Sequence, residues 1–197
     1  GYPELFPGFP QKRKEPEAGQ RLTKKLIKAW FDGKKLPPTP LADDASESFL
    51  LAVVQATLRP FLTSHARTLI GAVDQERWRR PYCPICGGSP DFSYLDKERG
   101  SRWLLCSRCD SEWLYQRLQC PFCGTQNQKA LTYFTDDKGL YRLYVCDDCK
   151  HYLKTIDLRQ TESGVPLPLE RLTTLDIDRQ ALEKGYRPYA VAGEKAK

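Results

Sequence analysis

Residues 83–149 read CPICGGSPDFSYLDKERGSRWLLCSRCDSEWLYQRLQCPFCGTQNQKALTYFTDDKGLYRLYVCDDC and contain all eight cysteines of the 197-residue chain. The cysteines form four Cys-x-x-Cys pairs: Cys83/Cys86, Cys106/Cys109, Cys120/Cys123 and Cys146/Cys149. A tetrahedral metal with thiolate ligands at about 2.3 Å needs sulfurs about 3.8 Å apart, which two cysteines separated by two residues reach across one turn. Each pair therefore supplies half of a site, and the sequence predicts two four-cysteine metal sites.

The segments between the pairs decide which pairs join. They are 19, 10 and 22 residues long, and the first has the usual zinc-ribbon spacing. A cross-braced arrangement would join alternate pairs, but each long segment reads as a β-hairpin, with apolar runs on both sides of DKERGS or DDKG. A hairpin returns the chain to its starting end. We therefore predict site 1 from Cys83, Cys86, Cys106 and Cys109, and site 2 from Cys120, Cys123, Cys146 and Cys149.

The two halves of this stretch resemble each other, which indicates duplication of one ribbon. CPICG at 83–87 matches CPFCG at 120–124, and three further pairs of positions correspond: Asp96 and Asp136, Gly100 and Gly139, Arg102 and Arg142. Gly87 and Gly124 directly follow the first pair of each half, where a left-handed backbone would turn N–H groups toward the sulfurs. Alternatively, these glycines only terminate the turn. Asp110 and Lys150 follow the second pairs instead.

Other cysteine chemistries fit the pattern less well. Disulfide scaffolds rarely place every cysteine in a close pair, and thioredoxin-like catalysis needs a pair at a helix N-terminus. Ferredoxin-type iron–sulfur clusters crowd three cysteines into one run, which this chain lacks. Zinc and mononuclear iron both suit a tetrahedral all-sulfur site, so the ligands leave the metal open. We interpret His151 as a strand residue and His65 as a helix residue, not as ligands.

The predicted architecture is α+β, with five consecutive regions. They are an extended arm at 1–20, a helical region at 21–80, a first four-cysteine β module at 81–119, a second at 120–160, and a C-terminal helix at 168–187. The arm lacks an apolar run and is not a signal peptide. Each module is too small to fold without its metal, so loss of metal should unfold it.

Apolar periodicity places the helices. Leu22, Leu26, Ala29 and Trp30 share one face of a helix that ends at Asp32-Gly33, and a second helix begins at Asp43 or Asp44. Pro60 is expected to break or kink that second helix. The C-terminal helix is expected to end at Gly185. The apolar run FLLAVVQATL at 49–58 is too short to span a bilayer, so we predict no membrane contact.

Two features predict how the modules pack: the segment DSEWLYQRLQ at 110–119 and the tyrosines of the hairpins. So short and apolar a link should hold the two modules rigidly together. Tyr94, Tyr133, Tyr141 and Tyr144 could dock a partner, but cross-strand packing explains them as well, and we favour packing.

The charge and the ligand set bear on function. The formal net charge of +6 falls to +2 when eight thiolates and two divalent metals are included, which weakens a nucleic-acid interpretation. Zinc ribbons of nucleic-acid proteins nevertheless keep that class as an alternative, beside a rubredoxin-like electron carrier. Four sulfur ligands leave no open position for water, and no other catalytic set is evident, so we predict a protein that is not an enzyme.

The order of motifs from about Pro81 to Pro188 resembles the formate dehydrogenase accessory proteins of the FdhE family. The motifs are CPICG, CSRCDSEW, CPFCG, CDDCKHYLKT and the terminal LTTLDIDRQALEKGYRP. Two differences stand out: Asp110 occupies a position where glutamate is expected, and the helical region before Cys83 is shorter than usual. The shortening concerns the choice of partner more than metal binding.

The resemblance implies a helical region with two rubredoxin-like modules, and iron or zinc held as single ions by the eight cysteines. It also implies a cytoplasmic maturation factor that binds the catalytic subunit of a molybdenum-dependent formate dehydrogenase and supports its assembly. We expect the metal-stabilised modules to present a surface to that subunit.

Overall fold

The computed structural model describes residues 23–32, 34, 44–162 and 164–189. The chain divides into two compact units, residues 1–54 and 55–197, and all eight cysteines lie in the second. No helix within the described ranges is long and apolar enough to cross a membrane. The predicted arm at 1–20 lies outside the described residues.

Helix α1 spans Lys24–Phe31, as its apolar periodicity predicts. The Thr23 side chain accepts a hydrogen bond from the Leu26 N–H at 3.2 Å and so caps the first turn. Leu26 and Trp30 are buried, and Asp32 caps the C-terminal end. This helix belongs to the first unit.

Helix α2 spans Asp44–Leu69 and is followed by a short 3₁₀ helix at Ile70–Ala72. It begins at one of the two predicted aspartates, but it continues through Pro60, so a break at this proline is wrong. A proline inside a helix removes one backbone hydrogen bond. Beyond Pro60, Leu62 and Ala66 pack into the core that surrounds the cysteines, and this burial offsets the lost bond.

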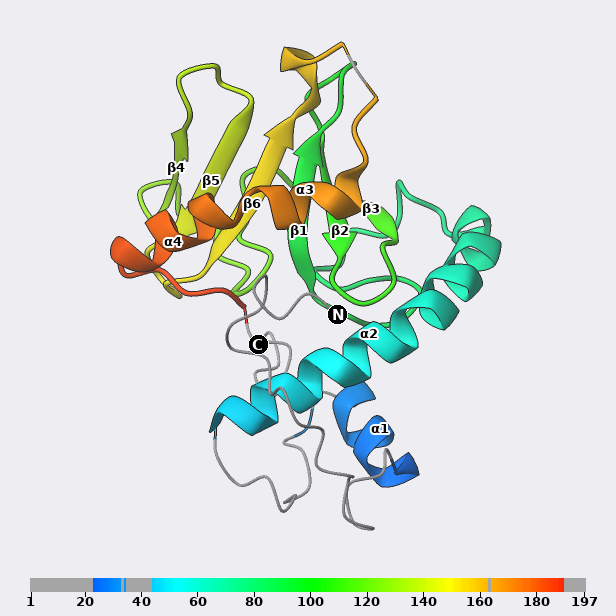
Figure 1. The fold of residues 1–197 in the computed structure, drawn as a ribbon. Helices are drawn as coiled ribbons and strands as arrows, with labels where there is room; N and C mark the ends of the chain where they lie inside the picture. The colour runs from blue at the N-terminus through cyan, green and yellow to red at the C-terminus, as the bar shows by residue number, and fades with distance from the viewer. Residues whose placement is uncertain (1–22, 33, 35–43, 163, 190–197) are drawn as a thin grey trace. The chain divides into compact units, whose positions relative to one another are not determined.

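Six strands form one sheet with the order β3-β2-β1-β6-β5-β4 (Figure 1). The predicted hairpins are confirmed, since β1 pairs with β2 and β4 with β5, both antiparallel. We call β1 to β3 with the first two cysteine pairs module 1, and β4 to β6 with the last two pairs module 2. The strands are β1 Pro90–Leu95, β2 Arg102–Cys106, β3 Glu112–Tyr115, β4 Leu131–Thr135, β5 Tyr141–Cys146 and β6 Tyr152–Asp157.

The two modules repeat along the sheet in the same orientation. Each contributes three neighbouring antiparallel strands, and β1 of module 1 pairs in parallel with β6 of module 2. In that pairing Phe92 lies opposite Lys154 and Leu95 lies opposite Asp157. The repeat in the sequence therefore appears as two copies side by side in one sheet.

The segment 110–119 packs between the modules as predicted, but it is not only a link. Residues Glu112–Tyr115 form β3, the outer strand of module 1, and Trp113 and Tyr115 are buried. Both pack in one core cluster with Phe122 and Leu153 of module 2. The pairing of β1 with β6 joins the modules as well.

Two short helices cover one face of the sheet, α3 at Leu167–Thr173 and α4 at Leu175–Glu183 (Figure 1). A single helix at 168–187 is therefore wrong, although the chain does turn at Gly185, whose φ is +83°. The two helices meet at Thr174. The buried Lys154 ammonium donates to the carbonyls of Arg171 at 2.9 Å and Thr174 at 3.3 Å, and these bonds anchor the junction to β6. A 3₁₀ helix at Leu158–Gln160 follows β6.

The core has a layer on each face of the sheet. Beneath α4, Ala181 packs with three strand residues: Leu143, Val145 and Tyr152. On the other face, Leu104, Trp113 and Leu153 pack with the cysteines and with Leu62 and Ala66 of α2. The cysteines thus lie inside this second layer.

Candidate metal centres

The four cysteines of module 1 come together as the first centre. Cys83 and Cys86 lie in the turn before β1, and Cys106 and Cys109 lie at the end of β2 and in the turn that follows. The Sγ atoms of Cys83 and Cys109 are 3.6 Å apart, and those of Cys86 and Cys106 are 3.4 Å apart. All four residues are buried. The structure thus brings together the four cysteines that the first hairpin predicts.

The second centre repeats this geometry in module 2. The sulfurs of Cys120 and Cys149 are 3.8 Å apart, and those of Cys123 and Cys146 are 3.7 Å apart. Cys120 and Cys146 are buried, whereas Cys123 and Cys149 are half-buried. One side of the second centre therefore faces solvent.

The sulfur geometry fits tetrahedral metal coordination. Within each centre all four sulfurs lie within 4.8 Å of one another. These separations are far longer than a disulfide bond of about 2.05 Å and close to the spacing of about 3.8 Å in a four-thiolate zinc or iron site. The eight cysteines are free thiols. Each centre can hold one metal ion, with iron and zinc equally suited by its donors.

All four Cys-x-x-Cys turns share one backbone feature. The residue directly after each second cysteine has a positive φ: +69° at Gly87, +57° at Asp110, +76° at Gly124 and +57° at Lys150. Two of these residues carry side chains, although the left-handed region costs a side chain about 1–2 kcal/mol. The turn therefore requires this conformation whether or not glycine occupies it.

Backbone N–H groups reach the sulfurs inside three of these turns. The N–H groups of Ile85, Arg108 and Phe122 each lie 3.4 Å from the sulfur of the cysteine two residues before. The Ser111 hydroxyl lies 3.1 Å from Cys109 Sγ. Such donors stabilise thiolates, as expected for metal ligands. The left-handed glycines end the turns, while the N–H donors come from other residues.

Burial makes four neighbouring thiolates unfavourable without a cation. It raises the pKa of the Cys106 thiol well above its ordinary value and raises that of Cys120 to about 12. A bound metal reverses this effect, because a coordinated thiol is deprotonated outright. The hydrogen bond with Cys106 lowers the pKa of Cys83, so the shifts within a centre differ in sign, and a bound metal would favour the thiolate form at every position.

Asp110 connects the first centre to two helices. Its carboxylate accepts hydrogen bonds from the Arg59 guanidinium of α2, and Arg171 of α3 lies 3.2 Å from its Oδ1. The Gln55 side chain of α2 also donates to the Ser107 carbonyl in the same turn, at 2.9 Å. The sequence contains no local signal for these contacts, since they join residues more than 50 positions apart.

The two histidines lie outside both groups of sulfurs. His151 is buried directly before β6, and its ring packs at 5.5 Å from that of Phe122 and at 5.2 Å from that of Tyr189. His65 is exposed on α2. Neither belongs to the described clusters of metal-binding side chains.

The hairpin tyrosines pack as cross-strand pairs or bond to neighbouring elements. Tyr94 stacks on its β2 partner Trp103 at 6.2 Å, and Tyr133 packs against its β5 partner Tyr144 at 5.3 Å. The Tyr141 hydroxyl donates to Glu170 at 2.7 Å. These contacts explain the tyrosines without a docked partner.

The sequence matches described proteins of one family. A family model described as "FdhE, central domain" matches residues 82–117. A protein FdhE homolog of Aquifex aeolicus is 33% identical over 183 residues, which covers 91% of this chain and 62% of the relative. Protein FdhE of Escherichia coli O127:H6 is 29% identical over 123 residues, which covers 59% of this chain and 40% of the relative.

A solved structure shares the fold. The crystal structure of the FdhE protein from Pseudomonas aeruginosa matches with a TM-score of 0.58 and 23% sequence identity, covering 83% of this chain and 66% of that one. The chain thus spans less than two thirds of the length of the curated relatives named here.

Proposed function

Because the predicted resemblance to the FdhE family is confirmed over 91% of the chain, we propose that this protein is a metal-binding accessory factor for a molybdenum-dependent formate dehydrogenase. It acts in the cytoplasm, binds the catalytic subunit of the enzyme and supports assembly of that subunit into an active form. Each of the eight cysteines is a ligand to one of two metal ions. The chain spans 62% of the length of the relative from Aquifex aeolicus.

The observation that supports this proposal is the pair of four-cysteine centres within one continuous sheet. A metal with four sulfur ligands has no open position for water or substrate, so the centres serve folding and not hydrolysis or group transfer. The parallel pairing of β1 with β6 fixes the two modules relative to each other. Such a rigid body suits a protein that holds another protein during assembly.

Capture of the partner tests the proposal. The tagged chain is produced in a bacterium that makes respiratory formate dehydrogenase and lacks its own FdhE protein. We expect the tagged chain to retain the catalytic subunit and to restore formate oxidation. A matched pair of variants controls for folding: Cys146→Ser should lose both effects, and Lys97→Gln on an exposed turn should keep both. A chain with two metals bound that retains no catalytic subunit contradicts the proposal.

One observation favours electron transfer as a second candidate function. Cys123 and Cys149 are half-buried, so the second centre can approach a redox partner while the first cannot. Electron transfer requires iron that cycles reversibly between two oxidation states. Elemental analysis of protein from its native host, with a visible spectrum before and after dithionite, separates the two candidates. A colourless protein with two zinc ions excludes the electron carrier and leaves the accessory factor.

A further inference from the structure

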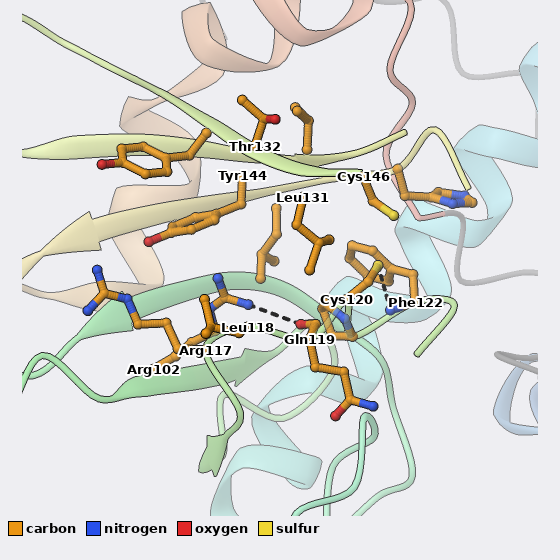
Figure 2. A pocket seen from close by; sticks show the side chains of 15 residues that line it. Arg102, Arg117, Leu118, Gln119, Cys120, Phe122, Leu131, Thr132, Tyr144 and Cys146 are labelled. Atoms are coloured by element: carbon orange, nitrogen blue, oxygen red, sulfur yellow. Dashed lines mark hydrogen bonds between the residues drawn. The ribbon is translucent and has the colours of Figure 1, made fainter. Parts of the chain in front are cut away.

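A cavity of about 450 Å³ lies between the two modules, on the sheet face opposite α3 and α4 (Figure 2). This volume falls within the range of about 300–1,000 Å³ that is typical of ligand pockets. Its walls are mainly apolar and include Phe122, Leu131, Tyr133 and Leu153. The buried side of the second centre, at Cys120 and Cys146, forms one end of the cavity.

Two arginines line the other end of the cavity (Figure 2). Arg102 exposes only 3% of its surface. Its Nη1 donates to the Gln119 carbonyl at 3.3 Å, and its guanidinium lies 4.3 Å from the centre of the Tyr144 ring. Its Nε is buried and has no hydrogen-bond partner among the described residues. Arg117 lies at the same end and is exposed.

The two modules carry opposite charges at one corresponding position near Arg102 and its counterpart. Arg142 of module 2 corresponds to Arg102, since each precedes the third cysteine of its module by four residues. Arg142 forms an ion pair of 2.6 Å with Asp157, which follows the last cysteine by eight residues. The corresponding position in module 1 is Arg117. Where one copy of the ribbon supplies a carboxylate to its arginine, the other supplies a second cation.

We propose that the cavity binds a carboxylate attached to an apolar group, with the carboxylate between Arg102 and Arg117 and the apolar group against Phe122, Leu131 and Leu153. The Nε of this planar guanidinium is buried and unpartnered among the described residues, and a guanidinium forms paired hydrogen bonds with a carboxylate. Burial lowers the pKa of Arg102 most strongly, and the charge of Arg117 lowers it as well. Tyr144 and Cys120 act to raise this pKa. A bound carboxylate offsets the effects of burial and of Arg117, because it supplies the opposite charge in a desolvated place.

The second centre does not replace such a ligand. Its thiolates would bring negative charge to the opposite end of the cavity, but no hydrogen bond in the described part of the chain joins Arg102 to a sulfur. The binding test therefore uses protein loaded with two zinc ions, in which this charge is already present.

Calorimetric titration of the zinc-loaded protein with sodium octanoate tests the proposal. We expect saturable binding of one octanoate, while 1-octanol and inorganic phosphate bind far more weakly because each lacks one of the two required groups. Arg102→Gln should weaken octanoate binding about tenfold or more, since it removes a charge-assisted hydrogen bond. Arg117→Gln should weaken it about threefold, as expected for a more exposed cation. Arg179→Gln, on the exposed side of α4, is the control and should have no effect.

Two further comparisons complete the test. The Arg117 variant keeps the proposal falsifiable if the buried Arg102 variant fails to fold. The dipeptide N-acetyl-Val-Leu and its C-terminal amide distinguish the sources of the carboxylate. Tighter binding of the dipeptide acid than of octanoate assigns the cavity to a peptide terminus, and the reverse assigns it to a small organic acid. Absence of binding by both acids, equal binding of octanol and octanoate, or unchanged binding by both arginine variants overturns the proposal.

Discussion

The two modules share one ribbon architecture but differ in how the rest of the protein packs against them. In module 1 all four cysteines are buried, and α2 and α3 contact the turn that holds Asp110. In module 2 two cysteines are half-buried, and Lys150, which corresponds to Asp110, makes a surface ion pair with Asp147. The comparison teaches that a duplicated metal module can become the folding core in one copy and an accessible centre in the other.

The largest difference in stability between the modules is expected when one cysteine ligand is replaced, with a separate variant for each centre. Cys106→Ser should reduce bound metal from two ions to one and unfold module 1, because structural zinc contributes about 10–16 kcal/mol in small zinc peptides. Part of α2 should unfold as well, since Leu62 and Ala66 pack on this module. Cys123→Ser should also cost one metal ion but leave module 1 folded. Metal analysis and limited proteolysis measure both outcomes. Retention of two metals by either variant would contradict the assigned ligands.

The next effect concerns Asp157, a buried carboxylate of module 2 at a position where module 1 has Arg117. The Asp157 side chain is fully buried and pairs with Arg159 at 2.7 Å and Arg142 at 2.6 Å. Asp157→Asn should lower the free energy of unfolding by about 3 kcal/mol at pH 7, because it leaves the largely buried Arg142 guanidinium without its carboxylate partner. Urea unfolding measures this change.

The same carboxylate predicts a pH dependence. The hydrogen bond from Arg159 lowers the pKa of Asp157 below its ordinary value. Its stabilising contribution is therefore complete above the unfolded-state pKa of about 4 and is lost as the pH falls through the lowered value. Between pH 5 and pH 3 the wild type should lose more stability than Asp157→Asn. Parallel loss in both proteins would argue against this role.

The residue that follows the second cysteine pair of each module also differs, being Asp110 in module 1 and Lys150 in module 2. Asp110→Gly relieves a left-handed side chain but removes the partner of Arg59 and Arg171. We expect a net destabilisation of about 2 kcal/mol, since a largely buried ion pair is broken. Thermal unfolding of the metal-loaded protein measures the change. A more stable variant would show that backbone strain outweighs the ion pairs.

The smallest effect is expected at the equivalent position of module 2. Lys150→Gly relieves the same backbone strain and removes two exposed contacts, the ion pair with Asp147 and the cation–π contact with Tyr186 at 5.5 Å. It should therefore stabilise the protein by about 1 kcal/mol. Lys138→Gly, in an exposed turn where no positive φ is required, serves as the control and should not stabilise. A loss of stability for Asp110→Gly and a gain for Lys150→Gly would show the difference between the modules in one thermal-unfolding assay.

The hairpins and the grouping of the cysteines were predictable because both depend on short separations along the chain. The predictions failed where distant contacts compete with local preference. The composition of residues 110–119 predicts only a link, whereas Glu112–Tyr115 also form β3 by pairing with β2. Similarly, the C-terminal apolar pattern favours one helix, whereas the structure has two, with the buried Lys154 ammonium bonded to carbonyls at their junction.

The sequence by itself determined the two four-cysteine groups, the two hairpins and the repeated ribbon. A Cys-x-x-Cys turn and a hairpin are closed by residues close together in the chain, so their chemistry can be read locally. Only the tertiary structure decided that β1 pairs with β6, that the first centre is fully buried, and that Arg102 and Arg117 line a cavity whose described lining residues include no carboxylate. These features depend on which faces of the sheet the helices cover, and that choice is made by burial across the whole domain.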